Sequence, residues 1–219
     1  MSGEALVPAV DRITTGSQVE RVVRDMILDG TLEPGTHLRE TQLAASLGVA
    51  RNTLREALRG LTEQGLVTHH PHRGVVVTDL TAEDVADLFR LRLVLELAGL
   101  RQVDAEGVER LGVATDAFAA ALSHGDAVEA LEHDFGFHRI LVAALGSGRL
   151  TAAHERAQGE LRLVLLHLDR NYEPPQVAEH RAILDAVRSG DGRAARSALT
   201  THLNRAAERL QQLIHTRES

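Results

Sequence analysis

The chain has 219 residues, of which 43% are hydrophobic, and this is enough to build one large or two modest globular domains. It contains no cysteine, which excludes a disulfide framework, a thiolate zinc finger and an iron–sulfur cluster. All 24 basic side chains are arginine, so Schiff-base chemistry and a P-loop lysine are excluded as well. The net charge of −7 argues at first sight against nucleic acid, because phosphate binding usually leaves a basic footprint.

The first 16 residues lack the charged start and long apolar core of a secretory signal peptide, and we interpret them as a flexible N-terminal arm. No apolar run further along the chain approaches the roughly 18 residues that a membrane-spanning helix needs. We therefore expect a cytoplasmic protein that does not engage a membrane.

The next segment, residues 17–78, predicts a small mixed domain. Apolar residues recur at helical spacing from Val19 to Ile27, from Leu43 to Leu47 and from Leu54 to Leu61. Only a few residues separate the second and third of these helices, so they form a helix-turn-helix. The run from Leu66 to Thr78 then has two β-prone stretches around a Pro/Gly turn, which indicates a hairpin.

Residues 79–219 have helical periodicity throughout and predict an all-helical domain of six helices. Thr81, Asp126 and Asp191 are the expected N-caps. The predicted fold class is mainly α: an N-terminal winged helix-turn-helix with a small β-hairpin, followed by a C-terminal six-helix bundle. The breaks between helices are expected at Glu106-Gly107, Gly125-Asp126, Gly146 to Gly148, Pro174-Pro175 and Gly190 to Gly192.

A basic stripe marks the third helix. Arg51, Arg55 and Arg59 are four residues apart, so they follow one slowly turning line on the helix surface. Guanidinium groups suit phosphate oxygens and the edge of guanine. An arbitrary arginine triplet is more often a solvated helix face. Here the stripe lies on the second helix of a helix-turn-helix, beside Asn52 and before a hairpin tip that carries Arg73, and this favours DNA binding.

The segment from Val19 to Thr78 resembles the winged helix-turn-helix of the GntR family of bacterial transcription regulators. The resemblance implies that Arg51 and Arg55 contact the operator and that the wing glycine, Gly74, lies near the minor groove. We add Asn52, Thr53 and Arg73 to this candidate DNA-binding surface. The residues that carry the resemblance are Pro34-Gly35, Leu43-Ala44, Leu47 to Val49, the string from Arg51 to Leu58, and Gly65 to Val67.

The charge is unevenly divided between the two segments. Residues 1–78 have 8 arginines against 9 acids, whereas the remainder has 16 arginines against 22 acids. Because salt screens charges beyond about 8 to 10 Å, a nearly neutral head with a basic stripe can bind DNA despite an acidic partner domain. Two heads on a homodimer, each reading one half-site of a double-stranded operator, would strengthen that binding.

Polar residues occupy predicted core positions in the helical domain. Asp134 and His138 are one helical turn apart on an inward stripe, and His180 and His202 replace aliphatic residues on two later helices. A single inward histidine is usually a hydrogen-bonded core residue, and an Asp–His pair can be a buried ion pair. Four such groups together favour a metal, with zinc first and nickel, manganese or iron as alternatives. The remaining histidines of this domain are assigned to polar faces or helix ends: His124, His133, His154, His167 and His215.

The region from Leu80 to about Leu213 resembles the FCD effector domain of the FadR branch of GntR regulators. The resemblance implies that Asp134, His138, His180 and His202 ligate one metal at the base of a pocket. Fatty-acyl-responsive relatives lack this set, so a small organic or sugar acid is the expected effector. The carrying residues are Leu88 to Arg92, Leu95-Glu96, Asp134-x-x-Phe137-His138, Glu179-His180 and His202-Leu203.

Two interpretations of Arg92 stay open: it clamps the acid effector, or it forms a surface or intersubunit ion pair with Glu96. The leading hypothesis for the whole chain is a ligand-responsive regulator, and we expect a repressor because repression is common in this family. The alternatives are a metal-dependent hydrolase or oxygenase on the helical domain and a constitutive DNA-binding protein with a structural metal. We favour a protein that is not an enzyme, because no general base follows the ligands at a fixed spacing.

Overall fold

The computed structural model describes residues 16–71, 74–168 and 175–218. The chain divides after Asp79 into two compact units, residues 1–79 and 80–219. The predicted N-terminal arm lies outside the described residues, except that Gly16 already belongs to the first helix. No helix in the described ranges has the length and apolar character needed to cross a membrane.

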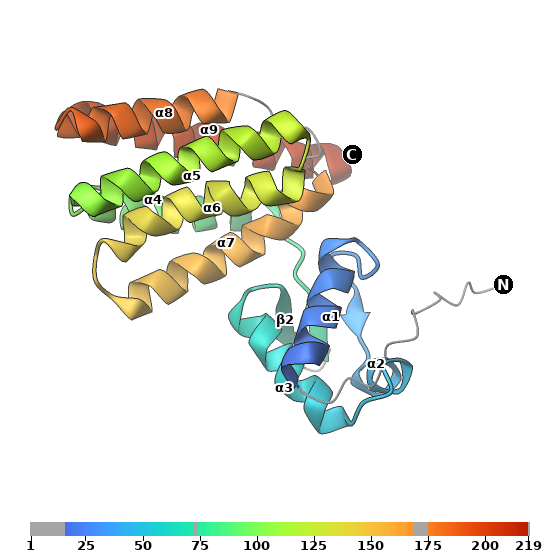
Figure 1. Cartoon of the computed structure of the whole chain (residues 1–219). Helices are drawn as coiled ribbons and strands as arrows, with labels where there is room; N and C mark the ends of the chain where they lie inside the picture. Colours follow the sequence, from blue (N-terminus) through green and yellow to red (C-terminus); the bar gives the residue numbers. More distant parts are fainter. Residues whose placement is uncertain (1–15, 72–73, 169–174, 219) are drawn as a thin grey trace. The chain divides into compact units, whose positions relative to one another are not determined.

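The first unit combines three helices with a small sheet, as predicted (Figure 1). The strand order is β1-β3-β2 and all pairs are antiparallel, with Val67 opposite Val77 and Leu38 opposite Val75. The hairpin β2–β3 was expected, whereas β1 is an addition, because a two-residue strand has no periodicity to recognise. The elements are α1 (Gly16–Leu28), β1 (His37–Leu38), α2 (Glu40–Ser46), α3 (Arg51–Glu63), β2 (Val67–His70) and β3 (Gly74–Val77).

Helix α3 is held by its apolar face and presents its polar face outward. Leu54, Leu58 and Leu61 are buried and α1 packs against them. The helix follows Ala50, which offers no side-chain cap. Asn52 lies inside the first turn and is exposed, so it does not replace the missing cap. The packing of the leucines therefore fixes α3, and its arginines are left on the surface.

The described part of the second unit contains six helices, as the periodicity predicts (Figure 1). Helix α4 packs against α6, α7 and α9, and α8 packs against α5 and α9. One apolar core joins all of these helices, and Phe89, Leu111 and Phe137 are among its members. The helices are α4 (Ala82–Leu100), α5 (Ala105–His124), α6 (Ala127–Ala143), α7 (Gly148–Leu168), α8 (Pro175–Arg188) and α9 (Gly192–Glu218).

All three predicted N-caps lie at helix starts, whereas one predicted break between helices is misplaced. Thr81 forms a capping box with Asp84, Asp126 accepts a hydrogen bond from the Glu129 amide, and Asp191 accepts one from the Ala194 amide. The break expected at Glu106-Gly107 is wrong. Helix α5 already begins at Ala105, because Asp104 caps it by accepting from the Gly107 amide at 2.8 Å.

Candidate functional site

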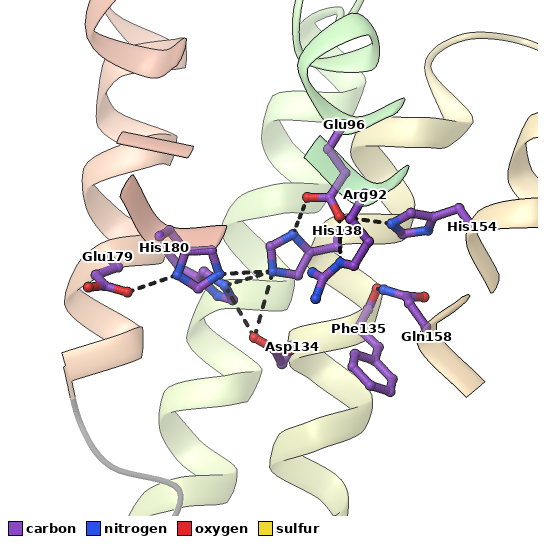
Figure 2. Close-up of polar contacts among 10 residues, drawn as sticks. Arg92, Glu96, Asp134, Phe135, His138, His154, Gln158, Glu179 and His180 are labelled. Atoms are coloured by element: carbon purple, nitrogen blue, oxygen red, sulfur yellow. Dashed lines mark hydrogen bonds and ion pairs between the residues drawn. The ribbon is translucent and has the colours of Figure 1, made fainter. Parts of the chain in front are cut away.

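The four predicted metal ligands lie together in the interior of the helical unit (Figure 2). Asp134 and His138 come from α6, His180 from α8 and His202 from α9, and all four side chains are buried. One possible ligand atom from each residue lies within 4.8 Å of the others. The helices bring the groups together because each residue occupies an inward position on its own helix.

His138 is the centre of this cluster. Its Nε2 atom lies 3.1 Å from Nε2 of His202, 3.3 Å from Nε2 of His180 and 3.8 Å from Oδ1 of Asp134. Oδ1 of Asp134 is also 3.3 Å from Nε2 of His180. Three imidazole nitrogens and one carboxylate oxygen therefore converge on one small volume, which is a donor set that suits a divalent transition metal.

Carboxylates bind the Nδ1 atoms of two of the three imidazoles, opposite the Nε2 atoms that face the cluster. Nδ1 of His138 lies 2.6 Å from Oε2 of Glu96, and Nδ1 of His202 lies 2.9 Å from Oε2 of Glu179. A carboxylate only accepts hydrogen bonds, so in both imidazoles the proton is on Nδ1 and the lone pair is on Nε2. These two lone pairs face one another at 3.1 Å, without a hydrogen atom between them in the neutral imidazoles. A cation between the two nitrogens would turn this repulsion into coordination.

The electrostatics favour neutral imidazoles at His138 and His180 and an ionised carboxylate at Glu96. Burial lowers the pKa of His138, and this outweighs the opposing attraction of Glu96. Burial also holds the pKa of His180 well below its usual range, helped by repulsion from His202 and His138. Burial alone would raise the pKa of Glu96, but His138 and Arg92 outweigh it and lower that pKa well below its ordinary value. Neutral imidazole is the form that binds metal.

Four of the six candidate DNA-binding residues lie on helix α3. Arg51, Asn52 and Arg55 are exposed on α3, and Thr53 is half-buried beside them. Nε of Arg55 is 2.6 Å from Oε2 of Glu40, at the start of α2, and both side chains remain accessible to solvent.

The wing is described on both sides of its tip. Gly74 opens strand β3 with a φ of 77°, a left-handed conformation that favours glycine, and pairs with His70 across the hairpin. Arg73 lies outside the described residues.

Comparison with known proteins agrees with this two-part arrangement. Residues 15–77 match the family of bacterial regulatory proteins called gntR, and residues 87–205 match the FCD domain. The chain belongs to the GntR family. Two GntR-type features, a winged head and an FCD unit, therefore account for most of its length.

Relatives and a solved structure extend the similarity over the GntR-family chain. An uncharacterised regulator in an unstable DNA locus of Streptomyces ambofaciens is 36% identical over 198 residues, covering 87% of this chain and 83% of that protein. The gluconate operon repressor of Bacillus subtilis is 31% identical over 150 residues, covering 66% of this chain and 61% of the repressor. A crystal structure described as a GntR transcriptional regulator from Rhodococcus sp. RHA1 is 33% identical, with a TM-score of 0.76, and covers 89% and 96% of the two chains.

Arg92 of this GntR-family chain is buried and forms an ion pair with Glu96, at 2.9 Å between Nε and Oε1. The guanidinium also lies 4.9 Å from the centre of the Phe89 ring. The ion pair uses only Nε, and the buried Nη2 has no hydrogen-bond partner among the described residues. The partner of Arg92 is therefore Glu96, as one of the two interpretations held, but the pair is buried within the chain instead of lying at the surface or between subunits.

His154 corrects the sequence interpretation, which assigned it to a polar face. It is fully buried on α7, and its Nε2 lies 2.9 Å from Oε1 of Glu96. The signal was its spacing, because His154, Ala157 and Leu161 follow one buried stripe. The other four histidines occupy exposed or half-exposed positions, as expected: His124, His133, His167 and His215.

Proposed function

We propose that this GntR-family chain is a ligand-responsive transcription regulator whose helical unit senses a small carboxylic acid at a bound metal. Residues 17–78 serve as the DNA-binding domain, and residues 79–219 serve as the effector-binding and dimerisation domain. The regulators and repressors among its relatives support this assignment, and none of the names given above describes an enzyme.

One observation carries the metal part of the proposal: the lone pairs of His138 and His202 face each other at 3.1 Å inside an apolar bundle. Both imidazoles are held in this tautomer by carboxylates, so neither can turn its N–H toward the other. Asp134 adds one negative charge to the same volume. We assign Asp134, His138, His180 and His202 as the ligands, with zinc as the first candidate and nickel, manganese or iron as alternatives.

The effector part of the proposal rests on Arg92. Its Nη2 is a buried donor without a hydrogen-bond partner in the part of the chain that the structure describes, and leaving such a group unpaired is unfavourable. A carboxylate or hydroxyl group of a small acid would satisfy it. When bound, the metal supplies a positive charge and open coordination positions for the same acid. One relative is named as a gluconate operon repressor, which makes sugar acids the first compounds to test.

The exposed surface of α4 supports a homodimer. Leu91, Val94 and Ala98 are exposed and follow one stripe of the C-terminal half of α4, where the exposed side chains are apolar. Val94 is 68% exposed, which is unusual for a residue of this type in such a run. We propose that a second copy covers this stripe and that the two winged heads read two half-sites of a double-stranded operator.

The DNA-binding part of the proposal assigns the operator contacts to the residues of α3 and the wing. They are Arg51, Asn52, Thr53, Arg55, Arg73 and Gly74. Arginine forks on this helix suit guanine in the major groove, and repression by operator occupancy is the expected sign of regulation.

The deciding experiment combines elemental analysis with an operator-binding titration. Purified protein is analysed for zinc, nickel, manganese and iron. Its binding to labelled DNA from the region upstream of its own gene is then followed by the fluorescence anisotropy of that DNA, in the presence of single carboxylic acids, beginning with gluconate. We expect about one metal per chain and a release of DNA by at least one acid. The same titration with a His138→Asn, His202→Asn double variant should show no acid response. A metal-loaded protein whose DNA affinity and melting temperature respond to no acid would instead be a constitutive DNA-binding protein.

A further inference from the structure

Glu96 is a buried carboxylate in the interior of the helical unit, where it meets one arginine and two histidines (Figure 2). Its side chain is fully buried on α4 and faces three other side chains. Oε1 accepts hydrogen bonds from Nε of Arg92 and from Nε2 of His154, each at 2.9 Å. Oε2 accepts one from Nδ1 of His138 at 2.6 Å. Both oxygens are therefore engaged, and the carboxylate is fixed in orientation from α4 and α7.

This arrangement determines what His138 offers to the cluster. Because Oε2 takes the proton-bearing Nδ1, the opposite nitrogen, Nε2, is left with a lone pair directed at His180, His202 and Asp134. Rotation of the ring would break the 2.6 Å hydrogen bond and leave a buried carboxylate oxygen without its donor. The tautomer and the direction of His138 are thus set by Glu96 rather than by the ligands themselves.

The three imidazoles differ in their outer support, by which we mean the carboxylate that accepts a hydrogen bond from Nδ1. Glu179 plays the corresponding part for His202, but its side chain is 19% exposed and is shared with the surface residue Arg205. Nδ1 of His180 has no hydrogen-bond partner among the described residues. Outer support is therefore strongest at His138, whose Nε2 lies 3.1 Å from Nε2 of His202 and 3.3 Å from Nε2 of His180.

We propose that Glu96 is the principal positioning residue of the metal centre, and that Arg92 and His154 hold Glu96 in place for this task. The proposal rests on the proposed metal site. Glu96 is not one of the four proposed ligands and acts through His138. Carboxylates behind a ligating histidine commonly alter metal affinity by about 10- to 100-fold when they are removed.

The test uses the full-length chain, freed of metal by a chelator, with the variants Glu96→Gln and Glu160→Gln. Glu160 is a matched control, because it also pairs with the arginine four residues before it, Arg156, at 3.1 Å. Zinc affinity is measured by competition with a chromophoric chelator, and Co²⁺ is added in parallel to record its visible absorption. We expect Glu96→Gln to weaken zinc binding about 10- to 100-fold and to shift the Co²⁺ bands, and Glu160→Gln to match the parent.

Two further variants keep the test decisive. Glu179→Gln should lose less zinc affinity than Glu96→Gln, and an equal or larger loss would overturn the leading role of Glu96. If Glu96→Gln does not fold, Glu96→Asp retains the charge but withdraws the oxygens by one methylene, and it should show the same direction of loss.

A purely structural role predicts a different result. The folded Glu96→Gln variant would then melt at a lower temperature but bind zinc with the parent affinity and the parent Co²⁺ spectrum, and this outcome overturns the proposal. Failure of the parent to bind zinc, cobalt, nickel or manganese would be distinguishable, because it removes the metal site itself.

Discussion

The ring of Phe137 lies parallel to the imidazole of His180, with 4.2 Å between the ring centres and 7° between the planes. Phe118 approaches the same imidazole at 5.3 Å in a tilted orientation. His180 is thus fixed by aromatic packing, whereas carboxylates fix His138 and His202. An apolar enclosure disfavours the charged imidazolium, so His180 stays neutral in the folded protein.

The stability of the metal-free protein should therefore decrease as the pH falls below about 6.5. Burial lowers the pKa of His180 and of His138 in the folded state, so at mildly acidic pH the unfolded chain binds more protons than the folded one. The contribution of these two histidines to stability is complete above about pH 6.5 and is lost progressively below that pH. Glu96, whose pKa is also lowered, begins to lose its contribution to stability only below about pH 4.3. Urea unfolding of chelator-treated protein between about pH 7.5 and 5.5 measures the slope.

His180→Leu should make this pH slope shallower, because one buried titrating imidazole is removed. His133→Leu is a suitable control, since His133 is half-exposed on α6 and pairs with the exposed Glu129 at 3.7 Å. It should retain the parent slope. If both variants unfold with the parent pH dependence, the acid sensitivity does not come from the buried cluster.

Metal removal should lower the stability of the helical unit measurably. A ligand that binds only the folded state stabilises it by about 2.7 kcal/mol when its free concentration is 100 times its dissociation constant. We therefore expect zinc to raise the melting temperature of chelator-treated protein and a chelator to reverse this. His202→Asn, which removes one donor from the cluster, should reduce the zinc-induced shift. An equal shift in parent and variant would mean that zinc binds elsewhere.

The closest approach of α4 to α6 depends on Gly99. A Cβ atom at this position would lie inside contact distance of the backbone carbonyl of Leu141. Gly99→Ala should therefore force the two helices apart and reduce the free energy of unfolding by about 1 to 3 kcal/mol. Because Glu96 and His138 lie within one turn of this crossing, zinc affinity should fall as well.

The matched control is Gly136→Ala on α6, where the added methyl group meets only the end of the Arg139 side chain, at 4.0 Å. Alanine is the better helix former by about 1 kcal/mol, so this variant should be as stable as the parent or slightly more so. Chemical denaturation of both variants decides the matter, and equal stabilities would show that the helices do not need glycine at their crossing.

Much of this fold could be predicted because its helices have clear apolar periodicity and ordinary caps. Thr81 and Asp126 mark real helix starts, and the segment after Asp79 is helical throughout its described parts. The start of α5 was misplaced because Gly107 looked like a break. In the structure its amide is satisfied by Asp104, so glycine in the first turn is tolerated.

The candidate site was predicted only in part, because sequence spacing indicates facing directions but not distances between helices. The i, i+4 spacing of Asp134 and His138 placed both on one inward stripe, and the structure agrees. The environment of Glu96 could not be predicted, since its partners His138 and His154 are 42 and 58 residues away. The polar-face assignment of His154 failed because a histidine counts as polar even when its neighbours along the stripe are buried.

Arg55→Ala should weaken operator binding about tenfold or more without destabilising the protein. The exposed ion pair of Arg55 with Glu40 contributes little to stability, about 0 to 1 kcal/mol, so its loss should leave the melting temperature nearly unchanged. On DNA, the same guanidinium has a phosphate or guanine as its partner, and such a contact is worth about 1 to 3 kcal/mol. The control is Arg90→Ala, an exposed arginine on α4 in the helical unit. Fluorescence anisotropy with upstream DNA checks the prediction; parent-like affinity of Arg55→Ala, or an equal loss in both variants, would contradict the assignment of α3 as the DNA-reading helix.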